Sequence, residues 1–406
     1  MKCRHCERDL TLPFIDLGIM PPSNAYLSSR EECANEKSFP LKVWVCQHCW
    51  LVQTEDYNRA EELFTADYAY FSSTSATWVA HAKCFAEQAI AQLNLTTQSF
   101  VVELAANDGY LLQYFVGAGI PCLGVEPTAA TAAAAKSKGI NVVEVFFGEA
   151  QAHSLREHYG RADLIVANNV LAHVPAINDF VAGIAAMLKP EGVCSVEFPH
   201  LVNLIKYKQF DTIYHEHYSY LSLHSLRIIL QAAGLYVFKV EVLSTHGGSL
   251  RVWSSLVSSR AVEPSVEMIL ADEASMGMTT REGYGGFQSE IVRVANDFLD
   301  FLQQAKQKNK TVVAYGAAAK GNTFLNYLKV DKTMISAVFD AATSKQGKFL
   351  PGSHIPILSP AQLASYEPDY VVILPWNIRE EIMAQLKPYV SANCKFVTTI
   401  PELLIS

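Results

Sequence analysis

The sequence predicts an α/β protein of three consecutive units, and three observations carry this prediction. Two C-x-x-C pairs near the N-terminus indicate a zinc-binding segment. Residues 95–255 alternate short apolar strands with helices, which is typical of a doubly wound parallel sheet, and a second alternation begins near Thr311. We therefore expect an N-terminal zinc-binding domain at 1–75, a central Rossmann-like domain at 76–255, and a helical linker with a smaller Rossmann-like domain at 256–406. A length of 406 residues suits two or three domains.

The composition narrows the class of protein. Hydrophobic residues make up 50% of the chain and charged residues 18%, so large cores can form. A net charge of −8 without a basic run argues against nucleic acid or an acidic membrane surface as a partner. The polar start does not resemble a signal peptide, and no apolar run reaches membrane-spanning length. Nine cysteines, mostly scattered singly, indicate reduced thiols, so we expect a cytoplasmic protein, and a monomer.

The N-terminal unit is predicted from its cysteines. Cys3 and Cys6 form one C-x-x-C pair, and Cys46 and Cys49 form the other. Each pair can curl as a knuckle that presents two thiolates to one side, so two knuckles complete a tetrahedral site. Four thiolates leave no open position, which indicates one structural zinc that holds together a segment poor in core residues. A redox pair or a chance spacing is the alternative, and the histidines inside the knuckles are alternative ligands.

A stretch rich in aromatic and hydroxyl side chains precedes the first long helix. It contains Tyr68, Tyr70 and Ser72, and the helix is expected to begin near Ser75. Phenols and hydroxyls at this place can line a sugar pocket. Core aromatics followed by a helix N-cap explain the same residues equally well.

The central unit is organised around its first strand and the turn that follows it. Glu103 lies at the end of this strand, and Asn107, Asp108 and Gly109 form the turn. A second strand ends in Glu126, and an acid in this place accepts hydrogen bonds from the hydroxyls of a ribose. The turn has neither G-x-G-x-x-G spacing nor a lysine for phosphate, which favours a nucleoside without a pyrophosphate. S-adenosylmethionine (SAM) fits this description, and an ordinary βα unit is the alternative.

Polar side chains also follow the later strands of the central unit. A strand at 163–168 carries Asn168 and Asn169 at its C-terminal tip, and His173 follows after a turn. The next strand, at 193–198, also ends in polar residues. Ligands of open α/β sheets gather at the carboxyl ends of the strands, so we expect these side chains to share one crevice.

The densest group of ionisable residues follows this strand. Residues 214–220 hold three tyrosines, two histidines and a glutamate, which are costly to bury without a role. Histidine titrates near neutral pH and a neighbouring glutamate can orient it, so acid–base chemistry is favoured. A His-x-His metal site and a structural polar cluster are the alternatives. The helical H-E-x-x-H spacing is absent.

The C-terminal unit starts with a strand, a turn of small residues and a helix. Lys320 adds a positive charge at the start of this helix, which suits an anion. Ala318 replaces the middle glycine of G-x-G-x-x-G, and Asp340 follows the next strand at the spacing of a ribose-binding acid. A nucleotide diphosphate, a dinucleotide or a scaffold without a ligand all remain possible.

Together these motifs resemble the nucleotide-sugar C-methyltransferases, which methylate C-3 of dTDP-4-keto-deoxysugars. The resemblance covers nearly the whole chain and implies a zinc domain, a central SAM-methyltransferase domain and a C-terminal Rossmann-like domain that grips the sugar nucleotide, without NAD. One departure is the turn after Glu103, where related methyltransferases commonly have a glycine and this chain has alanine. The motifs that carry the resemblance are the two C-x-x-C pairs, 107–109, 169–175, 214–217, 246–251, 316–322 and 351–357.

The resemblance also implies roles for the predicted site residues. His217 is the base that removes the C-3 proton made acidic by the C-4 ketone, and Glu216 orients the polar groups around it. His173 and Tyr214 hydrogen-bond the developing enolate oxygen. The SAM contacts are expected from Glu103, Asn107, Asp108, Gly109, Glu126, Asn168 and Asn169. The substrate contacts are expected from Tyr68, Tyr70, Ser72, Arg251, Lys320 and Asn322.

The expected partner is therefore a nucleotide-diphosphate sugar, with dTDP as the nucleotide. Three other functions fit parts of the sequence: methylation of oxygen or nitrogen in a small molecule, catalytically silent binding of a nucleotide sugar, and NAD-dependent oxidation of one.

Overall fold

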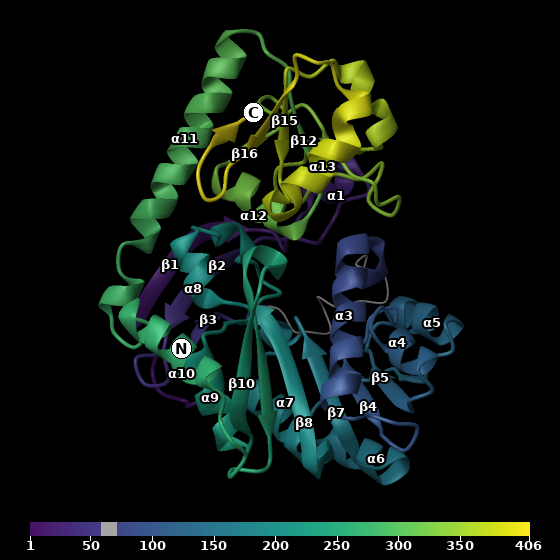
Figure 1. Ribbon diagram of the computed structural model, residues 1–406. Helices are drawn as coiled ribbons and strands as arrows, with labels where there is room; N and C mark the ends of the chain where they lie inside the picture. The colour runs from purple at the N-terminus through teal and green to yellow at the C-terminus, as the bar shows by residue number, and fades with distance from the viewer. Residues whose placement is uncertain (58–70) are drawn as a thin grey trace.

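The computed structural model describes residues 1–57 and 71–406, and three β-sheets organise this part of the chain (Figure 1). Tyr68 and Tyr70, expected to contact the substrate, lie outside the described residues. The α/β architecture with an N-terminal cysteine cluster, a central methyltransferase-like sheet and a C-terminal parallel sheet confirms the predicted fold class.

The N-terminal sheet is antiparallel and takes its last strand from the middle of the chain. On β2, every second residue from Leu41 to Val45 is buried, as expected for a strand with one face on a core. The fourth strand pairs with β3 although more than 160 residues separate them in sequence. The strand order is β1 (Leu12–Met20), β2 (Phe39–Val45), β3 (Val52–Thr54) and β9 (Ser219–Tyr220).

The central sheet has seven strands. Its five strands β4 to β8 are parallel, and β10 and β11 extend it as an antiparallel edge. Helices cover both faces, which explains why β4 and nearly all of β7 are buried. The order is β10 (Tyr236–Leu243), β11 (Ser249–Ser255), β8 (Leu188–Pro199), β7 (Ala162–Asn168), β4 (Val101–Leu104), β5 (Cys122–Val125) and β6 (Val142–Val143).

The helices of the central unit divide between the two faces of this sheet. One face packs against α3 (Ala76–Gln92), α4 (Leu112–Gly117) and α5 (Ala129–Ser137). The other packs against α6 (Glu149–Tyr159), α7 (Ile177–Met187), α9 (Leu223–Ala232) and α10 (Pro264–Ser275). Helix α3 begins near the predicted residue, because the hydroxyl of Ser75 accepts the N–H of Trp78 as an N-cap.

The C-terminal sheet has six strands and lies at the far end of the molecule from the central sheet (Figure 1). One core is shared by the N-terminal sheet, the long helix α11 (Phe287–Gln307) and α12 (Ala319–Tyr327). The order is β14 (Ile357–Leu358), β13 (Val338–Phe339), β12 (Val312–Tyr315), β15 (Tyr370–Ile373), β16 (Lys395–Thr398) and β17 (Leu404–Ile405). Within residues 1–57 and 71–406, the remaining α-helices are α1 (Arg30–Ala34), α8 (Leu201–Lys206) and α13 (Arg379–Leu386).

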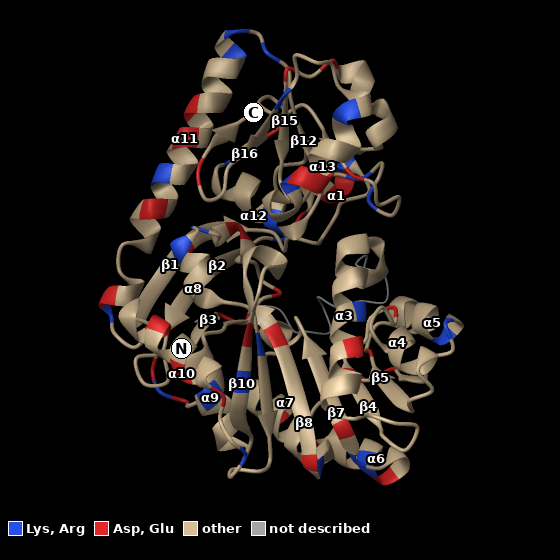
Figure 2. Ribbon diagram, viewed as in Figure 1, with Lys and Arg blue, Asp and Glu red and all other residues tan. Residues whose placement is uncertain are grey.

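Acidic and basic residues are interspersed over the outer elements, as along α11 in Figure 2. Over residues 1–57 and 71–406, no helix combines the length and the apolar character needed to cross a membrane.

Candidate active site

A cavity of about 1080 Å³ lies where the three parts of the chain meet. The N-terminal segment contributes Asn24 and Tyr26 to its lining, and the start of α12 contributes Lys320. The central sheet contributes the residues that follow the carboxyl ends of its strands. Ten of the predicted site residues line it: Ser72, Asn107, Glu126, Asn168, Asn169, His173, Tyr214, Glu216, His217 and Lys320.

The turn after β4 is tight, and a hydrogen bond to Glu126 holds it in place. The backbone N–H groups of Asn107 and Thr128 each donate to the Glu126 carboxylate at 2.9 Å. Asn107 and Gly109 have φ values of 50° and 75°, in the left-handed region. A side chain on Gly109 would also lie 2.2 Å from Ile140 Cδ1, so glycine is required there.

Asn168 and Asn169 present amide groups that suit a polar ligand. Both side chains line the cavity, and their oxygen and nitrogen atoms are buried without a hydrogen-bond partner among the described residues. Buried polar groups in proteins almost always have partners, so these amides fit a bound molecule with several donors and acceptors. Trp78 and Tyr110, whose rings stack with centroids 5.7 Å apart, add aromatic side chains to the cavity lining. The adenosyl and amino-acid parts of SAM match this donor set.

Three predicted cofactor residues shape the turn and do not line the cavity. Gly109 does so through its backbone conformation. Asp108 accepts the N–H of Ser73 at 3.2 Å and lies 3.7 Å from Lys138. Glu103 is fully buried, and this burial raises its pKa well above the ordinary value.

His217 is held in one tautomer. Its Nδ1 lies 2.8 Å from the carbonyl oxygen of Thr212. A carbonyl can only accept, so Nδ1 carries the proton and the neutral ring has its lone pair on Nε2. Burial, together with the nearby His173, lowers the pKa of His217 well below its ordinary value, which keeps the ring neutral.

Aromatic neighbours surround His217. The ring centroid of Tyr214 lies 3.9 Å from that of His217, and the centroid of His173 lies 4.6 Å from it. Burial lowers the pKa of His173 to about 4, although a hydrogen bond to the backbone of Glu216 opposes this shift. His246, which also lines the cavity, has its pKa lowered to about 4 by burial. The three histidines are therefore neutral at physiological pH.

Glu216 contacts a residue that sequence reasoning missed. Both of its carboxylate oxygens accept from Nδ2 of Asn24 at 2.8 Å, which joins the N-terminal segment to the histidine loop. His215 lies on the other side of this loop, where its Nε2 is 3.3 Å from the carbonyl oxygens of Phe39 and Pro40. His215 and His217 thus do not converge as a metal-binding pair.

The C-terminal part of the cavity is basic. Lys320 donates to Asn377 Oδ1 at 2.7 Å and lies 4.6 Å from the ring centroid of Trp376. Lys345 and Lys348, which the sequence reasoning missed, also line this part. Burial lowers the pKa of Lys320, and Asp211 opposes the shift. This part of the cavity therefore suits an anion.

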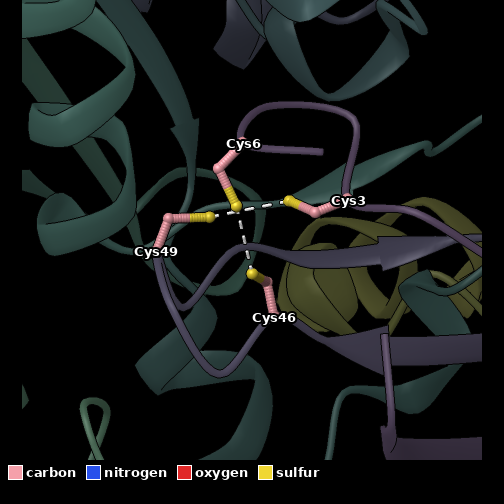
Figure 3. A group of neighbouring side chains, drawn as sticks. All are labelled: Cys3, Cys6, Cys46 and Cys49. Atoms are coloured by element: carbon pink, nitrogen blue, oxygen red, sulfur yellow. Dashed lines mark hydrogen bonds between the residues drawn. The ribbon is translucent and has the colours of Figure 1, made fainter. Parts of the chain in front are cut away.

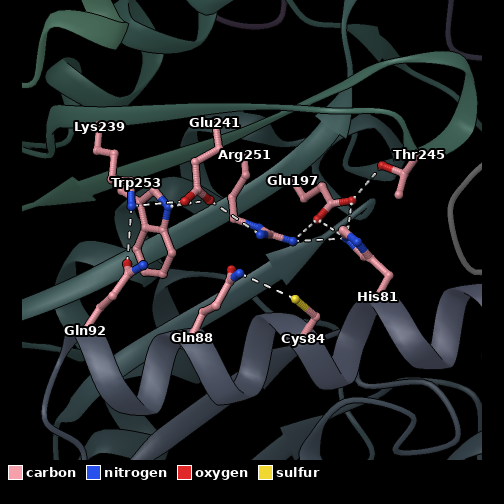
Figure 4. A network of polar contacts seen from close by, with 10 residues as sticks. All are labelled: His81, Cys84, Gln88, Gln92, Glu197, Lys239, Glu241, Thr245, Arg251 and Trp253. Atoms are coloured by element: carbon pink, nitrogen blue, oxygen red, sulfur yellow. Dashed lines mark hydrogen bonds and ion pairs between the residues drawn. The ribbon is translucent and has the colours of Figure 1, made fainter.

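Two predicted substrate residues lie outside the cavity lining. Arg251 is buried behind it, where Nη2 lies 2.7 Å from Glu197 Oε2 and 3.0 Å from Nε2 of His81 (Figure 4). Its contacts tie α3 to β8 and β11. Asn322 is also buried, and its Nδ2 donates to the carbonyl oxygen of Ser23 at 2.6 Å. Both side chains hold elements of the cavity wall in place.

The four N-terminal cysteines point at one centre (Figure 3). Their sulfur atoms all lie within 4.8 Å of one another, with Cys3 and Cys49 at 3.6 Å and Cys6 and Cys46 at 3.5 Å. A tetrahedral zinc–thiolate site has sulfur atoms about 3.8 Å apart, so this arrangement fits the metal. Each knuckle closes with a backbone hydrogen bond to its first cysteine and a left-handed residue after its second.

Three family models match successive parts of the chain. They describe a zinc binding domain at residues 3–64, a methyltransferase domain at 78–240, and a C-methyltransferase C-terminal domain at 244–401. The C-methyltransferase NovU of Streptomyces niveus is 34% identical over 402 residues, which span 99% of this chain and 96% of that protein.

The chain belongs to the C-methyltransferase family.

Solved methyltransferase structures resemble this C-methyltransferase over part of its length. The 1,6-didemethyltoxoflavin-N1-methyltransferase of Burkholderia thailandensis is 17% identical, with 50% of this chain and 94% of that chain covered and a TM-score of 0.38. The magnesium protoporphyrin IX methyltransferase of Synechocystis PCC 6803 is 16% identical, with 43% and 82% covered and a TM-score of 0.35. With TM-scores below 0.5, neither adds to the assignment.

The C-methyltransferase is thus a SAM-dependent enzyme with a zinc-binding N-terminal domain, as the sequence predicted. The four cysteines would hold zinc as a closed structural site. SAM supplies an electrophilic methyl group when it is bound.

Proposed function

We propose that this C-methyltransferase methylates C-3 of a nucleotide-diphosphate-linked 4-keto-deoxysugar through an enolate, with His217 as the base. One observation carries the proposal: the carbonyl of Thr212 fixes the proton of His217 on Nδ1, so Nε2 is available to take another. This ring lines the cavity that also contains the amides of Asn168 and Asn169 and the basic group around Lys320.

The first step is removal of a proton from C-3. The C-4 ketone makes this proton acidic, the C–H electron pair becomes the enolate, and the proton moves to Nε2 of His217. General-base catalysis of this kind contributes about 10²–10⁴-fold. The resulting imidazolium keeps its hydrogen bond to Thr212, so the ring need not turn during the reaction.

Negative charge then grows on the C-4 oxygen. We assign the hydroxyl of Tyr214 as its donor, since the ring centroids of Tyr214 and His217 lie 3.9 Å apart and Tyr214 lines the cavity. His173 is the second assigned contact from the sequence. Because its neutral ring has only one N–H, its hydrogen bond to the backbone of Glu216 would have to change before it could donate to the enolate. Fixed donors at a developing oxyanion are usually the largest single contribution to such a step.

Carbon–carbon bond formation depends on how the protein places the two reactants relative to each other. The enolate carbon attacks the methyl group of SAM, the sulfur–carbon bond breaks, and the sulfur leaves as a neutral thioether. Glu126, Asn107, Asn168 and Asn169 are the proposed contacts that hold SAM, and the aromatic wall of Trp78 and Tyr110 limits the access of water. Holding the two reactants in line is the protein's main contribution to this step.

The basic end of the cavity supports a diphosphate. Lys320, Lys345 and Lys348 all line it, and Asp211, which interacts electrostatically with Lys320, does not. Methylation of an oxygen or a nitrogen would need only one deprotonated group, and the cluster of histidines and tyrosines would exceed that need. The proposed nucleotide is dTDP.

Hydrogen exchange tests the proposal. The wild-type enzyme is incubated in heavy water with a dTDP-4-keto-deoxysugar and no SAM, and with the matching 4-hydroxy sugar as control. We expect deuterium at C-3 of the ketone alone and, after SAM is added, a product about 14 mass units heavier than the unlabelled ketone, with its new methyl on carbon. Methylation on oxygen, or turnover of the 4-hydroxy sugar, would contradict the enolate route. A panel with other nucleotides tests the dTDP preference.

A further inference from the structure

One side chain connects the zinc-binding segment to the histidine loops. Arg4 lies between the first two cysteines, and its side chain is 6% exposed. Its guanidinium reaches two carbonyl groups: Nη1 donates to Pro175 O at 3.0 Å and Nη2 to Thr54 O at 2.9 Å. Nη2 also lies 2.7 Å from the carboxylate of Asp56.

One carbonyl group belongs to the loop of His173, and the other belongs to a residue that is hydrogen-bonded to the loop of His217. Pro175 follows His173 by two residues in the same loop. Thr54 is bonded directly to the loop of His217: its Oγ1 donates to His217 O at 3.1 Å, and its N–H donates to Tyr218 O at 3.1 Å. The guanidinium therefore sets the spacing between the two loops.

Two further contacts close this arrangement. The guanidinium of Arg4 lies 5.4 Å from the ring centroid of Tyr218, close enough for a cation–π interaction. The N–H of Tyr218 donates to Ala172 O at 2.8 Å, which joins the two histidine loops to each other.

The other end of Arg4 is fixed by the cysteine knuckle. Its backbone N–H donates to Gln53 Oε1 at 2.9 Å, and Nε2 of this buried glutamine donates to Cys3 Sγ at 3.2 Å. A continuous path of hydrogen bonds thus runs from a cysteine of the zinc site to the loops of His173 and His217.

We propose that Arg4 is a positioning residue for His217 and His173, so that the zinc knuckle sets the geometry of the reactive cluster as well as stabilising its own segment. This inference rests on the proposed role of His217. A planar guanidinium that bonds two carbonyls holds a fixed distance between them, which a lysine cannot do. Misplacement of a reacting group by about 1 Å can cost 10²-fold in rate.

The test compares Arg4→Ala and Arg4→Lys with Arg8→Ala, whose exposed side chain follows the same knuckle. All three should keep about one equivalent of zinc by elemental analysis. We expect Arg4→Ala to lose roughly 10–100-fold in kcat, by the same distance argument, with an unchanged KM for SAM. Arg4→Lys should lose nearly as much, because it keeps the charge and reaches only one carbonyl. Arg8→Ala should match the wild type.

A second readout needs no substrate. NMR of ¹³C-labelled histidine, with His217→Asn used for assignment, follows the titration of His217. The groups that face this ring are His173, His246, Lys320, Tyr214 and Tyr220. A loosened loop admits water and reduces the desolvation that lowers the pKa of His217, so its pKa should rise toward the ordinary value in Arg4→Ala. An unchanged titration and unchanged kcat in a zinc-loaded Arg4→Ala variant would overturn the inference.

Thr54→Val covers the case in which Arg4→Ala does not fold. Valine has the same shape and lacks only the hydroxyl that bonds His217 O. We expect the same direction of change in titration and kcat, and wild-type values in this folded variant would equally overturn the inference. A wild type that exchanges no C-3 proton would defeat the proposed function instead, and the NMR comparison would still test Arg4.

Discussion

The two parallel sheets of this enzyme begin with the same strand–turn–helix unit, but the acids at their strand ends differ in whether they line the cavity. In the central sheet, Glu126 accepts two backbone N–H groups and still lines the cavity. In the C-terminal sheet, the carboxylate of Asp340 accepts the N–H groups of Ala317 and Ala342, each at 2.7 Å, and does not line it. The amides of Asn168 and Asn169 have no counterpart among the residues that follow the C-terminal strands and line the cavity.

The difference shows that the topology of a Rossmann-like unit does not by itself define a nucleotide site. Strand-end acids bind a ribose only when their oxygens remain accessible to it. In the C-terminal unit, the carboxylate of Asp340 accepts a backbone N–H of its own loop. The same loop carries Lys345, which donates to Ala317 O at 2.8 Å. The unit therefore presents lysines to the cavity, whereas its strand-end acid does not line it.

The largest expected effect comes from replacing the proposed base, His217, in the loop before β9. His217→Asn should lose both C-3 exchange and methylation by roughly 10²–10⁴-fold, because asparagine has no basic nitrogen. SAM affinity, measured by calorimetry, should stay within twofold of the wild type. A folded variant that methylates at the wild-type rate would remove His217 from the chemistry.

The next largest effect concerns which cofactor stabilises the protein, SAM at the central sheet or NAD at the C-terminal sheet. SAM at one hundred times its Kd should stabilise the protein by about 2.7 kcal/mol, whereas NAD at the same concentration should leave the melting temperature unchanged. Differential scanning calorimetry measures both. Stabilisation by NAD would mean that the C-terminal sheet keeps a dinucleotide site despite the contacts of Asp340, and the comparison would fail.

Matched acid variants test the same contrast residue by residue. Glu126→Ala should weaken SAM binding by about 1–3 kcal/mol, the value of hydrogen bonds to a charged group. Asp340→Ala should leave SAM binding intact and lower the free energy of unfolding, because two backbone N–H groups lose their acceptor. Calorimetry and urea denaturation separate the two outcomes, and equal SAM affinity in both variants would place the ribose elsewhere.

A smaller effect is expected at the basic end of the cavity. Lys345→Ala should weaken binding of the nucleoside diphosphate by about 1 kcal/mol, since one partly exposed charge is lost. Lys332→Ala, a change at an exposed lysine of the same unit, is the matched control. Titration with dTDP measures both, and equal affinities would move the diphosphate away from Lys345.

The smallest effect concerns pH. Only neutral His217 can accept the proton, so activity is lost as the pH falls through its pKa. Because burial lowers this pKa, the acidic limb of kcat/KM should lie below about 6.5, the ordinary value for histidine. A limb at or above that value would show that the ring is solvated in the working enzyme.

Much of the fold could be predicted from local patterns. The C-x-x-C spacing indicated the zinc site, and strands followed by polar turns indicated the central crevice, because each signal lies within a few residues of sequence. The origin of the fourth strand of the N-terminal sheet could not be predicted, since β9 has only two residues and pairs with a segment far along the chain.

The site was predicted in part for the same reason. The histidine loop is one continuous motif, and its Tyr214, Glu216 and His217 line the cavity. Asn24 and Lys345 reach the cavity only through the packing of separate units, and neither belongs to a motif that the sequence analysis identified. Arg251 was expected at the substrate from the resemblance carried by residues 246–251, but Glu197 and Glu241 already bind its guanidinium.

The short strand β9 has a consequence for the engineering of chimeric enzymes. The family models divide the chain between residues 64 and 78, yet the N-terminal sheet is complete only with residues 219–220, next to His217. A domain exchange at that division would pair the β3 edge of one enzyme with the histidine loop of another. Exchanges that transfer residues 1–57 and 212–221 together preserve this pairing, and these are the units that recombination between relatives would have to keep together.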